Sequence, residues 1–259
     1  MEQRDRMQKV DKEQYYKFIE LARENTCNTV YPMSIAEGFQ DGDIFTDCVE
    51  QPTFALFWHV SGFAYLTGRP ADKHLDDIYR LMKNEDGTNP RRFVLELKDE
   101  EVAAYFRRKE SVEEHPRYRF HLQEKELSED ELPLGYELRE VDVELLAKIS
   151  GNIVPASFWR SDADFLEKGK GYCVMYGDEV ASIAFSAAIS SEQVDIGIET
   201  AEAHRRKGLA VIAAKKMVAY VKSIDKEPVW DCNVANEGSR RTAENVGFRI
   251  MAEHAFYKI

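Results

Sequence analysis

The stretch VDIGIETAEAHRRKGLAVIAAKKMVAYV, residues 194–221, carries the strongest structural signal in this 259-residue chain. Its β-branched start predicts a strand over residues 194–200, and a polar turn follows. A helix is predicted over residues 208–223, because apolar side chains recur on one face at positions 209, 212, 213, 217 and 221. The segment therefore predicts a strand, a tight turn and a helix N-terminus in succession.

Such a turn is suited to an anion. The first N–H groups of a helix lack intrahelical acceptors and carry the positive end of the helix dipole, an arrangement that favours a pyrophosphate. Arg205, Arg206 and Lys207 precede the helix, and small Gly208 and Ala210 let phosphate oxygens approach the backbone. Neither GxGxxG nor GxxxxGK[ST] occurs, so dinucleotide-binding and P-loop folds are disfavoured.

The residues before this segment alternate between helical and strand-like patterns. An acidic stretch at 123–133, QEKELSEDELP, reads as a linker and predicts two domains, 1–130 and 131–259. Residues 41–47, DGDIFTD, lack the glycine and glutamate of a calcium loop and are predicted to form a turn. In the first domain we predict helices at 11–25, 72–84 and 99–108, a loop-rich stretch from 31 to 42, and strands at 53–60, 61–68, 92–97 and 117–122.

The second half has the pattern of a mixed α/β domain with an antiparallel meander in its middle. Strands are predicted at 136–139, 171–176, 180–188, 194–200 and 229–232, followed by a strand pair at 248–251 and 255–258. Helices are predicted at 141–150, 162–169, 208–223 and 237–246.

Composition excludes several classes of partner. The formal charge of −12 argues against nucleic acid and anionic membranes, whose binding depends on Lys and Arg. No apolar run approaches the length of a membrane span and no signal peptide is visible, so we expect a cytoplasmic protein. The four cysteines form no CxxC pair and the six histidines do not cluster, so no metal site is expected.

Residues 136–259 resemble the GCN5-related N-acetyltransferase family. The pyrophosphate loop of that family, Q/R-x-x-G-x-G/A, is met here by Arg205, Gly208 and Ala210. Residues 229–248, VWDCNVANEGSRRTAENVGF, are similar to the strand, Asn, helix and G-F ending of the family. Within the family, the DIGIET strand and the two-domain layout resemble a bacterial subgroup that includes zwittermicin-type resistance acetyltransferases.

The resemblance implies an acyl-CoA N-acyltransferase fold, a mostly antiparallel, splayed sheet flanked by helices, with acetyl-CoA as cosubstrate. It places the cosubstrate between the strand ending near Thr200 and the strand ending at Cys232. Backbone groups from Ile198 to Thr200 would pair with the pantetheine arm, and Asn236 would orient it. The pyrophosphate would be held by Arg205 and by the backbone of Arg206, Lys207, Gly208, Leu209 and Ala210.

The implied activity is transfer of acetyl to a primary amine of a small molecule, for instance an antibiotic or a metabolite. An alkylamine has a pKa of about 10 and must lose a proton, so Glu199 is the expected general base, with Asp195 on the same strand face as second choice. The tyrosine that protonates the leaving thiolate in this family is replaced by Ala243. Ser239, Tyr257 or water is expected to substitute for it.

The first domain carries no phosphate loop, so we expect a degenerate companion domain whose aromatic residues between 54 and 65 help to wall the acceptor site. Trp159 is a further candidate for lining that site. The missing tyrosine leaves an alternative of another class, a non-catalytic acyl-CoA-binding regulatory module. A monomer or a homodimer is expected.

Overall fold

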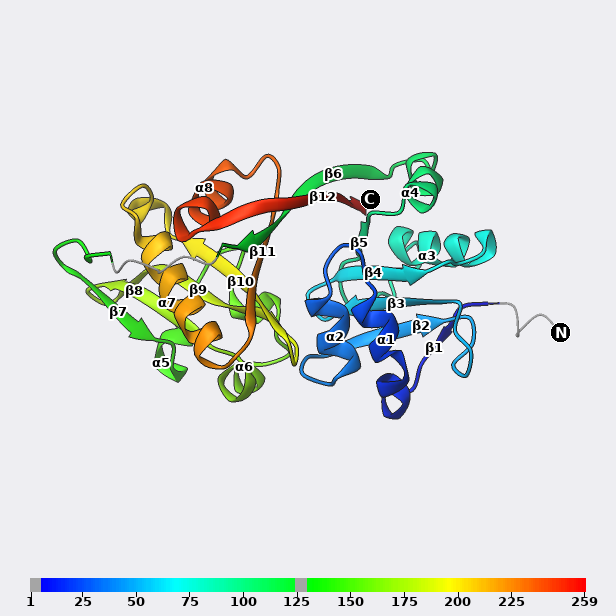
Figure 1. Ribbon diagram of the computed structural model, residues 1–259, viewed down its shortest axis with the longest axis horizontal. Helices are drawn as coiled ribbons and strands as arrows, with labels where there is room; N and C mark the ends of the chain where they lie inside the picture. Colours follow the sequence, from blue (N-terminus) through cyan, green and yellow to red (C-terminus); the bar gives the residue numbers. More distant parts are fainter. Residues whose placement is uncertain (1–5, 124–129) are drawn as a thin grey trace. The chain divides into compact units, whose positions relative to one another are not determined.

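The computed structural model describes residues 6–123 and 130–259, and within them the chain forms two compact units. Unit 1 consists of Met1–Arg117 with Glu253–Ile259, and unit 2 of Tyr118–Ala252 (Figure 1). The division thus falls at Tyr118 and again at Glu253, whereas we predicted domains 1–130 and 131–259. Whether either part folds as an independent domain stays a prediction, and most of the acidic stretch 123–133 lies outside the described residues.

Unit 1 is a mixed sheet with helices. Its strand order is β1-β2-β3-β4-β5-β12, in which β4 and β5 are parallel and the other neighbouring pairs are antiparallel. The helices are η2 (Lys12–Phe18), α1 (Ile19–Arg23), α2 (Val30–Ala36), α3 (Asp72–Lys83) and α4 (Glu100–Arg107). The strands are β1 (Gln8–Lys9), β2 (Gly42–Thr46), β3 (Phe54–His59), β4 (Phe63–Gly68), β5 (Val94–Leu97), the start of β6 (Glu113–Leu122) and the end of β12 (Phe248–Lys258).

The core of unit 1 forms where α3 and α4 meet the sheet. Every residue of β3 is buried, as expected of a strand covered on both faces. Leu75, Ile78 and Met82 recur at helical spacing on α3 and pack into the same hydrophobic cluster as Trp58 and Tyr257. The aromatic residues of β3 therefore serve as core residues of unit 1.

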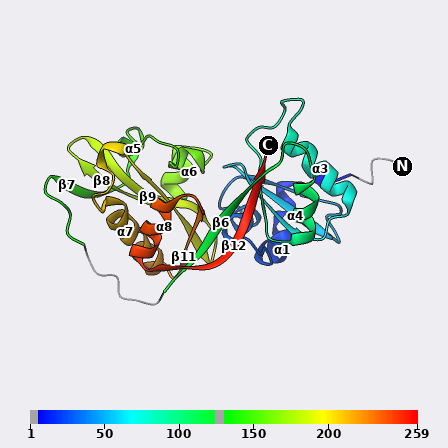
Figure 2. The same cartoon turned by 90° about the horizontal axis from the view of Figure 1, so that it is seen from above.

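The strands of unit 2 follow in the order β12-β6-β11-β10-β9-β8-β7, with β10 and β11 parallel. The predicted meander is confirmed, because β7, β8, β9 and β10 pair antiparallel in sequence. Its strands are β7 (Tyr136–Glu140), β8 (Gly171–Tyr176), β9 (Glu179–Ile189), β10 (Gln193–Thr200) and β11 (Glu227–Asn233), and its helices α5 (Val143–Leu146), η3 (Pro155–Ser157), α6 (Asp162–Lys168), η4 (Glu202–His204), α7 (Leu209–Ser223) and α8 (Glu237–Val246). Figure 2 shows α7 and α8 on one side of these strands and α5 and α6 on the other.

Close packing at the centre of unit 2 depends on a glycine in β10. A Cβ built on Gly197 would lie 2.6 Å from Cζ of Phe185, whose ring fills that space. Phe185 in turn meets Phe158 and Phe165 edge-on, at centroid distances of 5.8 and 6.3 Å. On the opposite side, α7 buries its apolar stripe, Leu209, Ala213, Ala214, Met217, Val218 and Val221. The helical periodicity of residues 208–223 thus corresponds to one buried helix face.

Two predictions, one for residues 248–258 and one for residues 31–42, are wrong. The strand pair at 248–251 and 255–258 is one continuous strand, β12, in which polar His254 is accommodated because its Nε2 lies 2.8 Å from Oε2 of buried Glu96. The stretch 31–42 contains helix α2, where Pro32 is tolerated because it stands in the first turn and its missing N–H would have no intrahelical acceptor.

The acidic stretch 41–47 is also not the expected turn. Residues Gly42–Thr46 form strand β2, where Asp43 is buried and forms ion pairs with Lys9 at 2.7 Å and Arg91 at 2.8 Å. The predicted helix at 11–25 is divided into η2 and α1.

Among the described residues, no helix combines the length and the apolar character needed to cross a bilayer.

Candidate functional site

Strands β10 and β11 diverge after a short parallel ladder. They pair only from Gln193 to Asp195 on β10 and from Glu227 to Val229 on β11, although both strands continue for several residues. The register of β10 with β9 also shifts between Asp195 and Ile196, which marks a bulge. From that point β10 pairs with β9 alone in the registers of the described residues, so its other edge is open to a ligand.

Ile198, Glu199 and Thr200 form the open end of β10. They are partly exposed, and their backbone pairs with Ala184, Ile183 and Ser182 of β9 on one edge. The Ser182 hydroxyl donates to the Glu199 carbonyl at 3.1 Å and also contacts the Thr200 hydroxyl at 2.8 Å. The strand end is therefore fixed on one side, and its backbone groups on the other side face the divergence from β11.

The turn between β10 and α7 has the backbone form of an anion site. Arg206 has φ +64° and Gly208 has φ +78°, so two residues of the turn are left-handed. Gly208 is the N-cap of α7, and no side chain of the described residues caps that helix. The first N–H groups of α7, including those of Leu209 and Ala210, thus remain for a ligand.

Two of the three basic residues hold the turn in place. Arg205 donates from Nε to the Thr200 carbonyl at 3.2 Å. Lys207 donates from Nζ to the Tyr136 hydroxyl at 2.9 Å and to the Ala203 carbonyl at 3.3 Å. Arg206 is exposed, and its side chain forms no hydrogen bond or ion pair with a residue in the described ranges. Arg206 is accordingly the basic side chain most available to a phosphate.

Tyr136 connects this turn to His204, a residue that the sequence did not single out. The Tyr136 hydroxyl lies 2.8 Å from Nδ1 of His204, and Nε2 of His204 lies 3.3 Å from Oε2 of Glu179. Lys207, Tyr136, His204 and Glu179 are thus connected by a continuous series of polar contacts. This network fixes the segment before the turn to β7 and to the β8–β9 hairpin.

The carboxylate of Glu199 is held by a distant loop. Its Oε2 accepts hydrogen bonds from the backbone N–H groups of Asn152 and Ile153, each at 3.0 Å. Gly151 stands directly against the same side chain. The other carboxylate oxygen of Glu199, Oε1, makes no hydrogen bond within the described parts of the chain. Glu199 therefore has one oxygen bound by the loop and one available for a proton.

Asn236 and Ser239 lie at the start of α8. Asn236 caps the helix by accepting from the Ser239 backbone N–H at 3.0 Å, and the Ser239 hydroxyl accepts from Nε1 of Trp230 at 3.1 Å. The hydroxyl proton of Ser239 thus remains to be donated. Ala243 is buried on the same helix and offers no donor.

The other candidates serve mainly structural roles. Asp195 is buried at 7% exposure beside the bulge of β10. Trp159 is also buried and donates from Nε1 to the Ser186 carbonyl at 2.8 Å, which makes it a core residue. Tyr257 belongs to unit 1, where its hydroxyl donates to Glu114 at 2.7 Å. Burial, assisted by Glu114, raises the pKa of Tyr257 and makes it a weaker proton donor.

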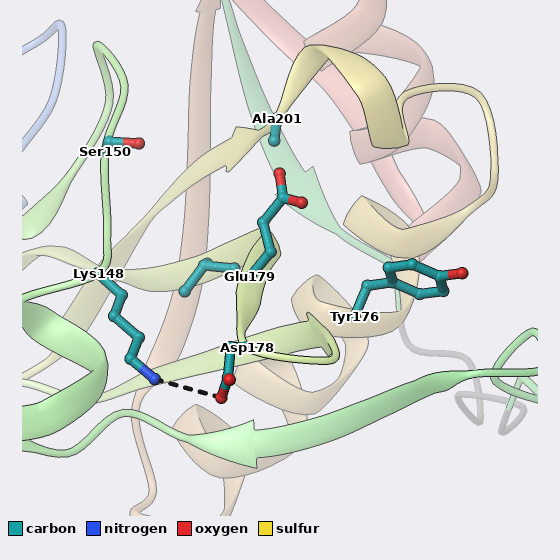
Figure 3. Close-up of a pocket in the computed structure, with 7 residues that line it drawn as sticks. Lys148, Ser150, Tyr176, Asp178, Glu179 and Ala201 are labelled. Atoms are coloured by element: carbon teal, nitrogen blue, oxygen red, sulfur yellow. Dashed lines mark ion pairs between the residues drawn. The ribbon is translucent and has the colours of Figure 1, made fainter.

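A surface pocket of about 580 Å³ lies in unit 2 beside the end of β10 (Figure 3). Lys148 and Asp178 form an ion pair across 3.7 Å at one side, and the Glu179 side chain points toward Ala201. The full lining consists of Lys148, Ser150, Tyr176, Asp178, Glu179, Val180 and Ala201. The lining combines charged and apolar side chains and includes Ser150, the residue before Gly151. Within the described residues, no three His, Cys, Asp or Glu side chains are grouped to hold a metal ion.

A splayed mixed sheet with an uncapped, basic turn between its central strand and the following helix defines an acyltransferase of the GNAT fold. The model of the family described as GNAT acetyltransferase matches residues 20–257, and the chain belongs to this family. The match includes unit 1, so the family relationship extends well beyond residues 136–259, where the sequence motifs lie.

Similar proteins share this layout over nearly their whole length. "Uncharacterized N-acetyltransferase YdfB" of Bacillus subtilis (strain 168) is 23% identical over 256 residues, which are 97% of this chain and 98% of the relative. A crystal structure of a GCN5-related N-acetyltransferase-like protein from Streptococcus suis superposes with a TM-score of 0.77 at 21% identity, covering 95% of this chain and 98% of that one. A tandem GNAT protein from the clavulanic acid biosynthesis pathway has a TM-score of 0.60 at 11% identity, with 97% of each chain covered. These structures show a common fold.

Proposed function

We propose that this acyltransferase moves an acetyl group from acetyl-CoA to a primary amine of a small molecule. The observation that carries the proposal is the uncapped turn from Arg205 to Ala210, with left-handed residues at Arg206 and Gly208, at the open edge of β10. A diphosphate fits this turn because its charge complements the helix dipole and the free N–H groups.

The residues around the turn fit the rest of the cosubstrate. Backbone groups from Ile198 to Thr200 would hold the pantetheine arm at the edge of β10 that β11 leaves free, and Asn236 would lie at the opposite strand. The backbone from Arg206 to Ala210, with Arg206 as the available cation, would hold the phosphates. Bound there, acetyl-CoA would supply an activated thioester.

The amine must be neutral before it attacks. An alkylammonium has a pKa of about 10, so a base is needed near neutral pH. We assign this role to Glu199 through Oε1, since Oε2 is already bound by the loop. The amine nitrogen forms a bond to the thioester carbonyl carbon, the carbon–sulfur bond breaks, and CoA leaves as a thiolate. A thiol has a pKa of about 8.5, so the thiolate is itself a tolerable leaving group. The proton that the nitrogen loses as it becomes an amide then reaches the thiolate through water or through the Ser239 hydroxyl, which passes on its own proton and regains one.

The net charge of the chain and its family support proposals about the acceptor and about the class of protein. The net charge of −12 suits a cationic amine better than nucleic acid or a membrane surface. We propose a bacterial cytoplasmic enzyme that is a monomer or a homodimer. Membership of the acetyltransferase family disfavours the alternative of a non-catalytic regulatory module.

The test is release of free CoA thiol from acetyl-CoA across a panel of primary amines, with calorimetry of acetyl-CoA binding. We expect turnover of at least one amine and loss of measurable acetyl-CoA binding in Gly208→Glu, which adds bulk and negative charge to the turn. Gly87→Glu is the matched control, because Gly87 is also left-handed with open space around it but lies in unit 1. Unchanged affinity in Gly208→Glu would contradict the assigned site, and no turnover of any amine would contradict the acceptor class.

A further inference from the structure

We propose that Gly151 is a positioning residue of the transfer reaction, because its turn, residues 151–153, holds the Glu199 carboxylate in the orientation needed for proton transfer. The inference rests on the proposed function, in which Glu199 is the base. It concerns the loop between α5 and η3, which the sequence motifs left without a role.

The first argument is the way the carboxylate is bound. Both hydrogen bonds from the turn, donated by Asn152 and Ile153 at 3.0 Å, end on the same oxygen of Glu199. Hydrogen bonds to an ionised acceptor are about twice as strong as neutral ones. Two of them on Oε2 restrict rotation of the carboxylate and leave Oε1 as the oxygen that can accept a proton.

The second argument is the need for glycine at position 151. Its φ of +136° is a conformation that side chains other than glycine rarely adopt. A Cβ at this position would lie 2.6 Å from Cγ, 2.9 Å from Cδ and 3.0 Å from Oε2 of Glu199. The Glu199 side chain thus occupies the space that any larger residue would need. Gly151 both permits the turn and makes room for the carboxylate.

The consequence for catalysis follows from geometry. Adding a methyl group at Gly151 requires either the Glu199 side chain or the turn to move by several tenths of an ångström or more. Displacement of a reacting group by about 1 Å can reduce a rate roughly 100-fold. In the proposed function, acetyl-CoA binds to the backbone of β10 and of the turn and not to the Glu199 carboxylate, so its binding should change little. The expected signature is a lower kcat at a nearly constant KM for acetyl-CoA.

The first experiment measures the turn itself and needs no turnover. Amide hydrogen exchange of Asn152 and Ile153 is followed by NMR in the wild type, Glu199→Gln, Glu199→Ala and Gly151→Ala. In Glu199→Gln the side-chain oxygen can still accept both hydrogen bonds, so the Asn152 and Ile153 amides should exchange within about threefold of the wild-type rate. In Glu199→Ala and Gly151→Ala these two amides should exchange about tenfold faster than in the wild type. Equal exchange in the wild type and Glu199→Ala would overturn the inference, even if Gly151→Ala failed to fold.

The second experiment measures kcat and KM with an accepted amine. Gly151→Ala should lower kcat roughly 10- to 100-fold and leave KM for acetyl-CoA within about twofold. Gly87→Ala is the control for a left-handed glycine whose Cβ meets nothing within 4 Å among the described residues. Full kcat in Gly151→Ala together with an inactive Glu199→Gln would overturn the inference alone. Full kcat in Glu199→Gln would overturn both the assignment of Glu199 as the base and the positioning role of Gly151. If the wild type turned over no amine, the proposed function would be contradicted, and the hydrogen-exchange result would still decide whether the turn holds Glu199.

Discussion

The left-handed conformation of Gly208 gives the sharpest prediction about the turn between β10 and α7, where we propose that the diphosphate binds. Gly208 has φ +78°, and a Cβ there would meet no atom of the described residues within 4 Å, so alanine is opposed by backbone strain and not by a clash. A left-handed conformation costs an L-residue about 1–2 kcal/mol, and asparagine tolerates it better. Gly208→Ala should therefore lose about 1–2 kcal/mol in total, and Gly208→Asn distinctly less.

Where this loss appears depends on what the turn does. If the turn keeps its form, the free energy of unfolding falls by the full amount. If the alanine introduced by Gly208→Ala relaxes to negative φ, the N–H groups turn away and acetyl-CoA binding weakens instead, at most about 10- to 30-fold, because 1.4 kcal/mol corresponds to a factor of ten. Urea unfolding and calorimetry on the same samples measure both parts. If alanine matched glycine within about 0.3 kcal/mol in both measurements, the conformational role of Gly208 would be refuted.

Two further perturbations test the surroundings of the site and the stability of unit 1. Tyr136→Phe removes the hydroxyl that serves buried His204, and an unsatisfied buried group costs about 1–3 kcal/mol, so urea unfolding should show a loss of that size. Tyr176→Phe should change stability by less than about 0.5 kcal/mol, since Tyr176 is half exposed and its hydroxyl makes no hydrogen bond with a described residue; equal losses in the two variants would contradict the network. In unit 1, burial, with nearby Arg91, lowers the pKa of His59 to about 3 from an unfolded value near 6.5, so the unfolded chain binds the extra proton as pH falls through 6.5. Stability should fall by about 2 kcal/mol between pH 7.5 and pH 5 through this group, and His59→Gln should show a correspondingly shallower pH dependence in urea unfolding, an unchanged dependence being the contrary result.

Local sequence predicted most of the elements because their signals are local. The α7 stripe, the antiparallel strands β8 and β9 and the helix α8 at Glu237–Val246 all depend on spacings of a few residues. The prediction failed where a long-range partner changes what a residue can do. Asp43 is typical of a turn, but in β2 its charge is compensated by ion pairs with Lys9 and Arg91. We predicted a break between residues 251 and 255, but the strand continues there and His254 lies against buried Glu96.

The candidate site shows the same division. The sequence placed Arg205, Arg206 and Lys207 in the turn before α7, but it did not show that Lys207 donates to Tyr136, 71 positions away. It selected Glu199 as a carboxylate at a strand end, but the Asn152 and Ile153 amides that hold it are 47 and 46 positions distant. The assignment of Glu199 and Ser239 as catalytic residues stays a prediction.

By itself, the sequence determined the mixed α/β class, the order of strand, turn and helix around residues 194–221, and the family to which the chain belongs. These properties follow from periodicity and from backbone preferences that act within one or two turns of chain. Only the tertiary structure decided which basic side chain of the turn has no partner among the described residues, which Glu199 oxygen is bound by the loop, and that the Glu199 side chain fills the space beside Gly151. Those properties depend on the contact of segments far apart in the chain, and close packing allows such contacts only in the folded molecule.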